Sequence, residues 1–308
     1  MERKKIYDCV IVGGGPGGLT AGIYAGRYNL KTLIIAKSFG GVANLAGEVE
    51  NWPGYVGPGI DLMRTFRNQA EKFGAEMIEG EISKVDKIKS SFEIFVGDKK
   101  YFGRTLIVAL GTEHRQLNIS GEKKFLGKGV SYCATCDGNF FRGKKVAVIG
   151  GADSAAKATI YLSDICKEVN VIYRKDEMRC EPIVLKKINK RENVKIYYGA
   201  EPIEILGEKV VKGLKIKKVD SDGEKEIILD LDGVFIEIGA TPVSEVVKDL
   251  EIKRDSEFIV TNEKMATNVE GVYAVGDVRK SPMKQIITSA SDGAIAAKSV
   301  HEFLTEKE

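Results

Sequence analysis

The fold of this chain is decided by YDCVIVGGGPGG, residues 7–18. Residues 7–12 are a short run rich in strand-forming residues and predict a buried β-strand. The glycines that follow surround Pro16, and residues 19–28 have the pattern of a helix with small residues on its packing face. Strand, glycine-rich turn and helix in this order predict a dinucleotide site, with the N–H groups of the helix N-terminus aimed at the pyrophosphate.

Three glycines of this turn have separate expected roles. Gly13 permits the tight turn, Gly15 lets the backbone approach a phosphate, and Gly18 lets the helix pack closely on the strand. Residues 31–35 predict the next strand. An acid usually ends that strand and binds a ribose hydroxyl, but the position is occupied by Ala36.

A second copy of the motif begins with the predicted strand at residues 144–149, followed by GGADSA and a predicted helix over 156–166. Ala152 replaces the middle glycine and adds a methyl group where the backbone approaches a phosphate. A further strand over 168–173 is followed by a group of cations, which suit a nucleotide 2′-phosphate, although a solvated charged turn would have the same composition. The cations are Arg174, Lys175 and Arg179.

Between the two motifs lies CATCD, residues 133–137. A C-x-x-C pair stores two electrons by closing and reopening a disulfide. Structural zinc needs four ligands, and the chain has no second C-x-x-C and only His114 and His301. The pair therefore predicts redox chemistry rather than a metal site or a Cys/His nucleophile. Asp137 is a candidate proton shuttle if burial raises its pKa, and otherwise a turn acid or helix cap.

Composition excludes several other classes. The chain has 308 residues, 43% of them hydrophobic and 30% charged, and a net charge of only +3. This balance gives no electrostatic case for a nucleic acid or an anionic membrane as partner. No apolar run reaches membrane-spanning length and no signal-peptide pattern is present, so a cytoplasmic location is expected. Cys9, Cys166 and Cys180 are isolated and predicted to be small buried or half-buried residues.

Together with three further motifs, these features resemble the low-molecular-weight thioredoxin reductases, a flavoprotein family with two dinucleotide-binding domains. The further motifs are EVENWPG at residues 48–54, GVYAVGDV at 271–278, and KQI at 284–286 with ASDG at 290–293. The matches span nearly the whole chain. They are specific when taken jointly.

The resemblance implies an α/β fold of two Rossmann-like, doubly wound domains, the second inserted into the first. The FAD-binding domain would comprise residues 1–112 and 245–308, and the NAD(P)-binding domain with the dithiol would comprise residues 113–244. Residues 106–112 and 233–239 each predict a strand that ends in glycine, as expected where the chain crosses between domains. The family also implies a homodimer.

The resemblance further implies an electron relay from NAD(P)H through FAD to the Cys133–Cys136 disulfide. Cys136 would lie against the flavin, and Cys133 would attack the disulfide of thioredoxin or a glutaredoxin-like protein while Asp137 protonates the departing thiolate. The implied FAD residues are Gly13, Gly15, Pro16, Gly18, Gly41, Asn51, Asp277, Lys284, Gln285 and Ile286. The implied NADP residues are Gly150, Ala152, Ser154, Arg174, Lys175 and Arg179.

The sequence also departs from the family pattern. Val42 replaces a flavin-contacting glutamine, and Lys175 stands in a cluster that is otherwise rich in arginine. NADPH is the expected donor, with NADH, a deazaflavin or ferredoxin as alternatives. A flavin-dependent dithiol oxidase and a flavin redox sensor without turnover are alternative functions. The intact cysteine pair and the retained second motif disfavour both.

Overall fold

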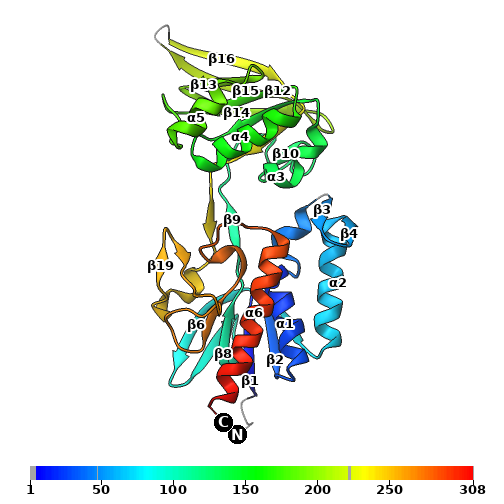
Figure 1. Cartoon of the computed structure of the whole chain (residues 1–308), viewed down its shortest axis with the longest axis vertical. Coiled ribbons are helices and arrows are strands. Elements are labelled where there is room, and N and C mark those ends of the chain that lie inside the picture. Colours follow the sequence, from blue (N-terminus) through cyan, green and yellow to red (C-terminus); the bar gives the residue numbers. More distant parts are fainter. Residues whose placement is uncertain (1–4, 47, 221–222, 308) are drawn as a thin grey trace. The chain divides into compact units, whose positions relative to one another are not determined.

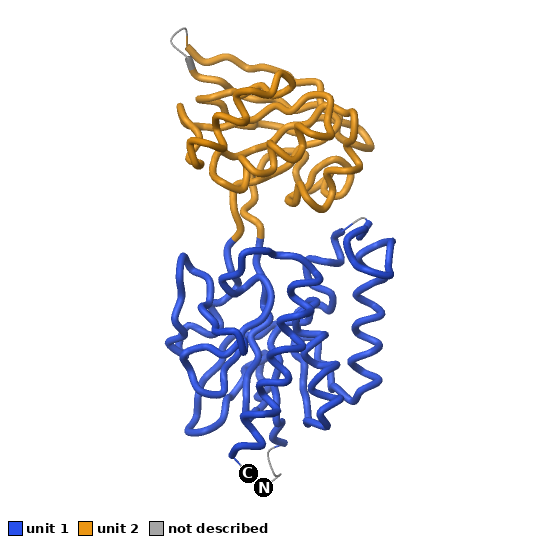
Figure 2. The backbone as a smooth tube through the Cα atoms, in the orientation of Figure 1, with its two compact units in different colours: residues 1–113, 241–308 blue, residues 114–240 orange. Residues whose placement is uncertain are grey.

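The computed structural model describes residues 5–46, 48–220 and 223–307. Figure 1 shows the course of the chain, which divides into two compact units. Unit 1 comprises residues 1–113 and 241–308, and unit 2 comprises residues 114–240 (Figure 2).

Unit 1 is built on a mixed sheet with the order β5-β2-β1-β8-β7-β6, in which β21 also pairs with β8. Strands β5, β2, β1, β8 and β21 run parallel, and β6, β7 and β8 form an antiparallel meander. The strands are β1 (Ile6–Val12), β2 (Thr32–Ala36), β5 (Glu76–Glu79), β6 (Ile82–Ile88), β7 (Ser91–Val96), β8 (Lys99–Val108) and β21 (Val272–Ala274).

One hydrophobic core of unit 1 packs the sheet against three helices: α1 (Pro16–Arg27), α2 (Gly59–Lys72) and α6 (Ile286–Thr305). Helices α1 and α6 approach closely, because a Cβ at Gly293 would lie 2.2 Å from the carbonyl oxygen of Gly17. The smaller elements are η1 (Gly41–Leu45), β3 (Val49–Trp52), β4 (Tyr55–Gly57), η3 (Glu245–Leu250), β19 (Arg254–Asp255), β20 (Phe258–Ile259) and η4 (Gly276–Val278).

Unit 2 contains a five-stranded parallel sheet with the order β10-β17-β11-β12-β13. Its strands are β10 (Val130–Ser131), β11 (Lys145–Ile149), β12 (Glu168–Tyr173), β13 (Val194–Tyr198) and β17 (Gly233–Ile236). The chain leaves β11 toward β12 on one side, while β17 pairs on the other side of β11. In open α/β sheets ligands bind where the strand order reverses in this way, at the carboxyl ends of the strands.

The two faces of this sheet are covered differently. One core includes residues of α4 (Asp153–Ile165) and α5 (Pro182–Asn189). The other includes residues of a three-stranded antiparallel sheet, β14 (Ala200–Gly207), β15 (Val211–Asp220) and β16 (Gly223–Asp230). Alternate residues of β11 serve the two cores, as the twofold periodicity of a strand requires: Val146 and Val148 on one face, Ala147 and Ile149 on the other.

The predicted elements are present, with shifted ends. The helices predicted over 19–28 and 156–166 begin earlier, at Pro16 and Asp153. Proline is tolerated at a first helical position because the missing N–H has no partner there. The strands predicted to run to the glycines at 111 and 239 end at Val108 and Ile236. Gly111 and Gly239 have φ of 69° and 98°, which is incompatible with a continued strand.

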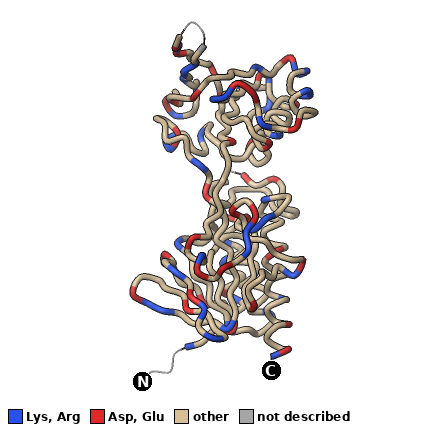
Figure 3. Tube along the Cα trace, turned by 90° about the vertical axis from the view of Figure 1, so that its left-hand side faces the viewer, with Lys and Arg blue, Asp and Glu red and all other residues tan. Residues whose placement is uncertain are grey.

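Strands β9 (Thr112–His114) and β18 (Ala240–Pro242) pair as a two-stranded sheet where the chain passes between the units. In the described parts of both units, Lys and Arg are interspersed with Asp and Glu along the chain (Figure 3). Among the described residues, no helix combines the length and the apolar character needed to cross a membrane.

Candidate active site

The cysteine pair lies in a short helical turn of unit 2, where Cys133 and Cys136 are joined by a disulfide with their Cα atoms 5.3 Å apart. Cys133 caps α3 (Ala134–Asp137): its Sγ lies 3.2 Å from the Cys136 amide nitrogen, which donates to it. The Asp137 N–H donates to the Cys133 carbonyl at 3.1 Å. Both cysteines are partly exposed. The pair predicted from the spacing is therefore closed and accessible.

Asp137, which directly follows Cys136 in α3, is held by Ser131, the last residue of β10. The Ser131 hydroxyl donates to Asp137 Oδ2 at 2.6 Å and accepts from the Cys133 N–H at 3.0 Å. Burial raises the pKa of Asp137, and the Ser131 hydrogen bond opposes that rise. A carboxyl group beside the cysteines with a raised pKa is suited to hold a proton. The sequence did not single out Ser131, because a serine before a C-x-x-C has no distinctive spacing.

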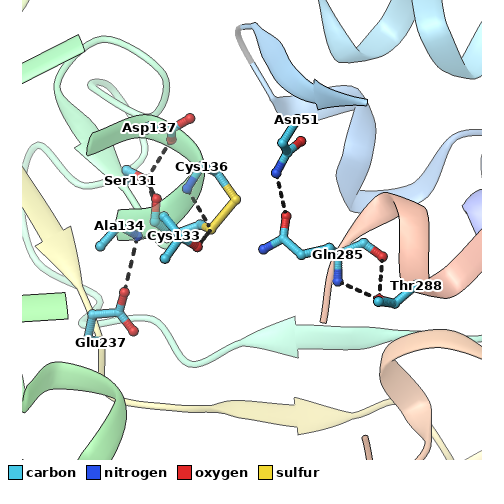
Figure 4. The surroundings of a disulfide bond; sticks show 10 residues. Asn51, Ser131, Cys133, Ala134, Cys136, Asp137, Glu237, Gln285 and Thr288 are labelled. Carbon is cyan, nitrogen blue, oxygen red and sulfur yellow. Dashed lines mark hydrogen bonds between the residues drawn. A yellow bond between two sulfur atoms is a disulfide. The ribbon is translucent and has the colours of Figure 1, made fainter. Parts of the chain in front are cut away.

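Glu237, which the sequence also did not single out, reaches the same turn from the end of β17. Its Oε1 accepts from the Ala134 N–H, between the cysteines, at 3.3 Å, and Figure 4 shows the carboxyl group pointing toward that amide. Burial raises the pKa of Glu237 to about 7, against the lowering effect of the Ala134 amide. Only its position at a strand end could have indicated a site residue.

The segment before the cysteines is fixed by Tyr132. Its hydroxyl donates to Glu122 Oε1 at 2.6 Å, and the N–H groups of Leu117 and Asn118 donate to the same carboxylate. The ring of His114 stacks on the Tyr132 ring with centroids 4.9 Å apart. Burial lowers the pKa of His114, which favours the neutral imidazole. These contacts set the direction from which the chain enters the dithiol turn.

In unit 1 the first glycine-rich turn has the geometry expected of a phosphate site. Gly13 has φ of 112°, and a Cβ there would lie 2.2 Å from the Ala109 carbonyl oxygen. A Cβ at Gly18 would lie 2.0 Å from the Gly13 carbonyl oxygen, so the helix requires glycine there. At Gly15, which caps α1 ahead of Pro16, a Cβ would meet nothing within 4 Å. The space beside Gly15 fits an approaching phosphate group.

Several distant residues gather at this turn. A Cβ at Gly41 would lie 3.3 Å from Gly15 Cα, which places Gly41 against the turn. A Cβ at Gly17 would lie 3.1 Å from the Ser289 carbonyl oxygen, so the first turns of α1 and α6 are adjacent. The beginning of α6, which carries the sequence motif at residues 284–293, therefore lies beside the first glycine-rich turn in space.

Asp277 lies in η4, where burial raises the pKa of its carboxyl group. Lys284 donates from Nζ to the Asp277 carbonyl oxygen at 2.7 Å, and burial lowers the pKa of its ammonium group. Gln285 caps α6, which begins at Ile286, and its Oε1 accepts from Asn51 Nδ2 at 3.0 Å (Figure 4). A half-buried acid, Asp277, and a half-buried base, Lys284, thus lie close to the beginning of α6.

The second glycine-rich turn also requires glycine at its first position. Gly150 has φ of 138°, and a Cβ there would lie 2.3 Å from the Glu237 carbonyl oxygen. Ala152 caps α4, in whose first turn Ser154 lies. The Arg179 N–H donates to the Gly151 carbonyl at 2.6 Å, which places the segment after β12 along the turn.

The three cations after β12 are exposed. Arg179 Nε donates to the Tyr173 hydroxyl at 3.2 Å, so this guanidinium is held next to the end of the strand. Arg174 and Lys175 follow the strand directly. The structure thus brings the second glycine-rich turn, Glu237 and the cysteine turn together in unit 2. Arg179 lies at the glycine-rich turn.

Within the described parts of the chain, no group of three or more His, Cys, Asp and Glu side chains is arranged to hold a metal ion. Cys9 and Cys166 are buried without a disulfide and Cys180 is half-buried. Burial raises the pKa of Cys9 to about 12 and that of Cys166 to about 11, so both remain thiols. The reactive sulfur chemistry is therefore concentrated at Cys133 and Cys136.

Comparison with known proteins agrees with this arrangement. Residues 7–293 match the model of the pyridine nucleotide-disulphide oxidoreductases. The chain is 39% identical to the thioredoxin reductase of Bacillus subtilis over 99% of its length and 97% of that protein. It is 40% identical to the thioredoxin reductase of Treponema pallidum, covering 97% of each. The crystal structure of thioredoxin reductase from Streptococcus pyogenes superposes with a TM-score of 0.93 at 36% identity, covering 99% of this chain and 100% of that one.

Two dinucleotide-binding motifs, a closed C-x-x-C disulfide and full-length similarity lead to one assignment. The family implies a flavin and a nicotinamide nucleotide as cofactors. The chain belongs to the pyridine nucleotide-disulphide oxidoreductase family, is an oxidoreductase, and has low-molecular-weight thioredoxin reductases as its full-length relatives.

Proposed function

We propose that this protein is a thioredoxin-disulfide reductase that passes electrons from NADPH, through FAD, to the Cys133–Cys136 disulfide and on to a small redox protein. The observation that carries the proposal is the closed disulfide beside Asp137, in the unit that also contains the second glycine-rich turn. Full-length similarity to thioredoxin reductases supports the same substrate class.

In the proposed reaction the reduced pair does thiol chemistry. The Cys133 thiolate attacks one sulfur of the substrate disulfide, so that a mixed disulfide forms and one substrate thiolate leaves. Cys136 then attacks the sulfur of Cys133, which releases the second substrate thiolate and restores the enzyme disulfide. Two electrons reach the substrate, and Asp137 supplies a proton to a departing thiolate. The Ser131 hydroxyl keeps the Asp137 carboxyl group beside the pair.

Unit 1 is proposed to bind FAD, which supplies two-electron transfer to the disulfide when bound. The open space beside Gly15, the N-terminus of α1 and the adjacent Gly41 suit its pyrophosphate. Asp277 has a carboxyl group suited to ribityl hydroxyls. Lys284, Gln285 and Ile286 begin α6, where Asn51 fixes the Gln285 amide.

Unit 2 is proposed to bind the nicotinamide nucleotide at Gly150, Ala152 and Ser154, with NADPH preferred over NADH. The preference rests on Arg174, Lys175 and Arg179, of which Arg179 is held by Tyr173. The proposed FAD-binding domain is residues 1–112 with 245–308, and the proposed NADP-binding domain is 113–244. We also predict that the protein forms a homodimer and is located in the cytoplasm. Thioredoxin is the predicted substrate, rather than a glutaredoxin-like protein.

One observation favours a second candidate for the electron donor. The Ala152 methyl group occupies the helix cap where the backbone of the first motif leaves open space at Gly15. A chain whose second motif has become less suited to nucleotide could receive electrons from a deazaflavin or from ferredoxin instead. The cysteine chemistry would be unchanged.

The test is Cys133→Ser, with Cys180→Ser as the matched control at the half-buried free cysteine of the same unit. Stopped-flow absorbance with NADPH, NADH and reduced ferredoxin follows flavin reduction, and a coupled assay follows reduction of thioredoxin. We expect Cys133→Ser to abolish thioredoxin reduction and leave flavin reduction by NADPH intact. Loss of flavin reduction in this variant contradicts the assigned order of electron transfer. Bleaching by ferredoxin alone selects the second donor.

A further inference from the structure

Glu237 lies in unit 2 between the proposed nucleotide site and the cysteine turn. Its N–H donates to the Ile149 carbonyl at 2.8 Å, and its own carbonyl oxygen lies 2.3 Å from where a Cβ of residue 150 would be. Its backbone is therefore fixed at the neighbouring carboxyl ends of β11 and β17. This is the place in the sheet where open α/β folds bind their ligands.

The Glu237 side chain leads from that position to the cysteines. Its Oε1 accepts the Ala134 N–H, which lies between Cys133 and Cys136 in the chain. The bonds of Ser131 and Asp137 described above run within residues 131–137. The Glu237 bond instead connects the turn to a strand end 103 positions away in sequence.

A carboxylate at this amide affects the two redox states differently. The disulfide carries no charge, whereas reduction produces thiols that ionise near neutral pH. A negative charge nearby opposes thiolate formation, and the effect is strengthened in a partly buried site. Glu237 is half-buried, and desolvation raises the pKa of its carboxyl group to about 7, so that group changes charge in the pH range in which the reduced cysteines also ionise.

We propose that Glu237 is a positioning residue for the dithiol: it holds the Ala134 amide and, when ionised, shifts the thiol–disulfide equilibrium of Cys133 and Cys136 toward the disulfide. The inference rests on the proposed function, because it assigns a role at the same cysteine pair. In this proposal the site has a second acid, Glu237, which acts through its hydrogen bond to the Ala134 amide. Asp137 is the acid that acts as proton donor.

Other ionisable groups belong to the elements around Glu237. They include Asp137 on α3, Glu122 and His114 at Tyr132 ahead of the cysteines, and Asp153 in the first turn of α4. Arg115, whose N–H donates to the Gly239 carbonyl at 3.0 Å, is a cation of the neighbouring segment. All of these groups remain in a Glu237→Gln variant. The difference between this variant and the unchanged protein therefore isolates the charge of Glu237, since glutamine keeps an oxygen that can accept the Ala134 N–H.

The equilibrium is measured on the flavin-loaded protein in glutathione and glutathione disulfide, with acid quenching, thiol alkylation and mass spectrometry. In this exchange two glutathione thiols are oxidised to one disulfide, the Cys133–Cys136 bond breaks, and the two thiol protons pass to the cysteines. At pH 8 we expect Glu237→Gln to favour the dithiol by about threefold to tenfold over the unchanged protein. At pH 6 the two should agree, because Glu237 is then protonated in both redox states.

Glu237→Ala separates positioning from charge. Loss of the acceptor should lower kcat for thioredoxin reduction by about tenfold, with KM for thioredoxin nearly unchanged, and Glu237→Gln should restore most of kcat. Glu168→Gln is the matched control, because Glu168 lies in the same sheet at the amino end of β12, whereas Glu237 lies at the carboxyl end of β17. If Glu237→Ala does not fold, the proposal is decided by the thiol–disulfide equilibria of Glu237→Gln and the unchanged protein at pH 6 and pH 8.

Equal equilibria for Glu237→Gln and the unchanged protein at pH 8, or an equal shift in Glu168→Gln, overturn the proposal. So does a kcat of Glu237→Gln as low as that of Glu237→Ala. The glutathione equilibrium needs neither a nicotinamide donor nor thioredoxin. Failure of the unchanged protein to reduce thioredoxin therefore counts against the proposed function, and absence of the Glu237 effect counts only against this inference.

Discussion

The two glycine-rich turns of this molecule, residues 13–18 in unit 1 and 150–155 in unit 2, share a strand–turn–helix path but differ in where glycine is needed. Their first positions are alike. Gly13 and Gly150 both have positive φ, and a Cβ at either would lie within 2.3 Å of a backbone carbonyl oxygen. Their third positions differ, since Gly18 has no room for a methyl group and its counterpart Ala155 carries one.

The middle positions are the most instructive. A Cβ at Gly15 would meet no protein atom within 4 Å, and Ala152 shows that the same cap accepts a methyl group. Folding therefore does not require glycine at Gly15. The remaining physical reason for glycine there is the approach of a ligand. The comparison separates glycines that the fold needs from one that the proposed cofactor needs.

The strands that follow the two turns differ as well. Strand β2 ends at Ala36, so no acid is available there for a ribose hydroxyl. Strand β12 ends at Tyr173, and Arg174 and Lys175 follow, with Arg179 held by the Tyr173 hydroxyl. The second strand is thus followed by the group of cations that the proposed 2′-phosphate contact requires.

The largest effect is expected for Gly18→Ala. The new methyl group would lie 2.0 Å from the Gly13 carbonyl oxygen, and backbone on both sides has to move. We expect a loss of about 3 kcal/mol in the free energy of unfolding, measured by urea denaturation. Gly22→Ala on the same helix is the control, because the atoms nearest to its Cβ would be side-chain atoms, Ile34 Cδ1 at 2.5 Å and Ala75 Cβ at 3.6 Å. Equal losses in both variants contradict the assignment of Gly18 to close packing.

Gly15→Ala should spare the fold and weaken flavin binding. Gly15 has φ of −76° and ψ of −173°, which alanine adopts without strain. The free energy of unfolding of the flavin-free protein should change by less than about 0.5 kcal/mol. The Kd for FAD, measured by fluorescence quenching, should rise by more than about tenfold. Unchanged FAD affinity would show that the open space at Gly15 is not the pyrophosphate site.

Arg179→Gln tests the cations of the second turn. We expect KM for NADPH to rise by about tenfold and KM for NADH to change by less than about twofold, because NADH lacks the 2′-phosphate that Arg179 is proposed to contact. Steady-state kinetics with both nucleotides measures this. Lys190→Gln, an exposed lysine at the end of α5, is the control for a general change in charge. Parallel changes for both nucleotides argue against a 2′-phosphate contact.

The smallest effect is expected for Ala152→Gly, which makes the second turn more like the first. Removal of the methyl group should lower KM for the nicotinamide nucleotide by about threefold. Glycine is also a better helix cap than alanine, so α4 should not be weakened. Isothermal calorimetry with NADP⁺ gives an independent affinity. A rise in Kd would place the nucleotide away from this cap.

Most of the fold could be predicted from local pattern. The strand–turn–helix order at residues 7–28 and 144–166 predicted a dinucleotide-binding sheet in each unit, because a buried strand and a packed helix leave different patterns in the sequence. The helix starts at Pro16 and Asp153 were missed by three positions, since capping depends on backbone angles that small residues do not reveal. The cysteine pair was recognised because its chemistry is fixed by two residues at one spacing.

The rest of the site could not be predicted. Glu122 and Glu237 act on the cysteine segment through hydrogen bonds that span 10 and 103 positions. The Asn51–Gln285 bond joins residues 234 positions apart. Such contacts carry no periodicity, and Glu237 looks in sequence like any polar residue at a strand end.

The sequence by itself determined the two dinucleotide-binding motifs, the redox cysteine pair and, through full-length similarity, the family. These depend on short-range geometry: a tight turn needs glycine, and a small disulfide ring needs two cysteines at close spacing. Only the tertiary structure decided which glycines the fold requires, and that Asp137 is held by Ser131 and the cysteine turn by Glu237. Those properties depend on packing and burial, which bring distant backbone and carboxyl groups together and set their pKa.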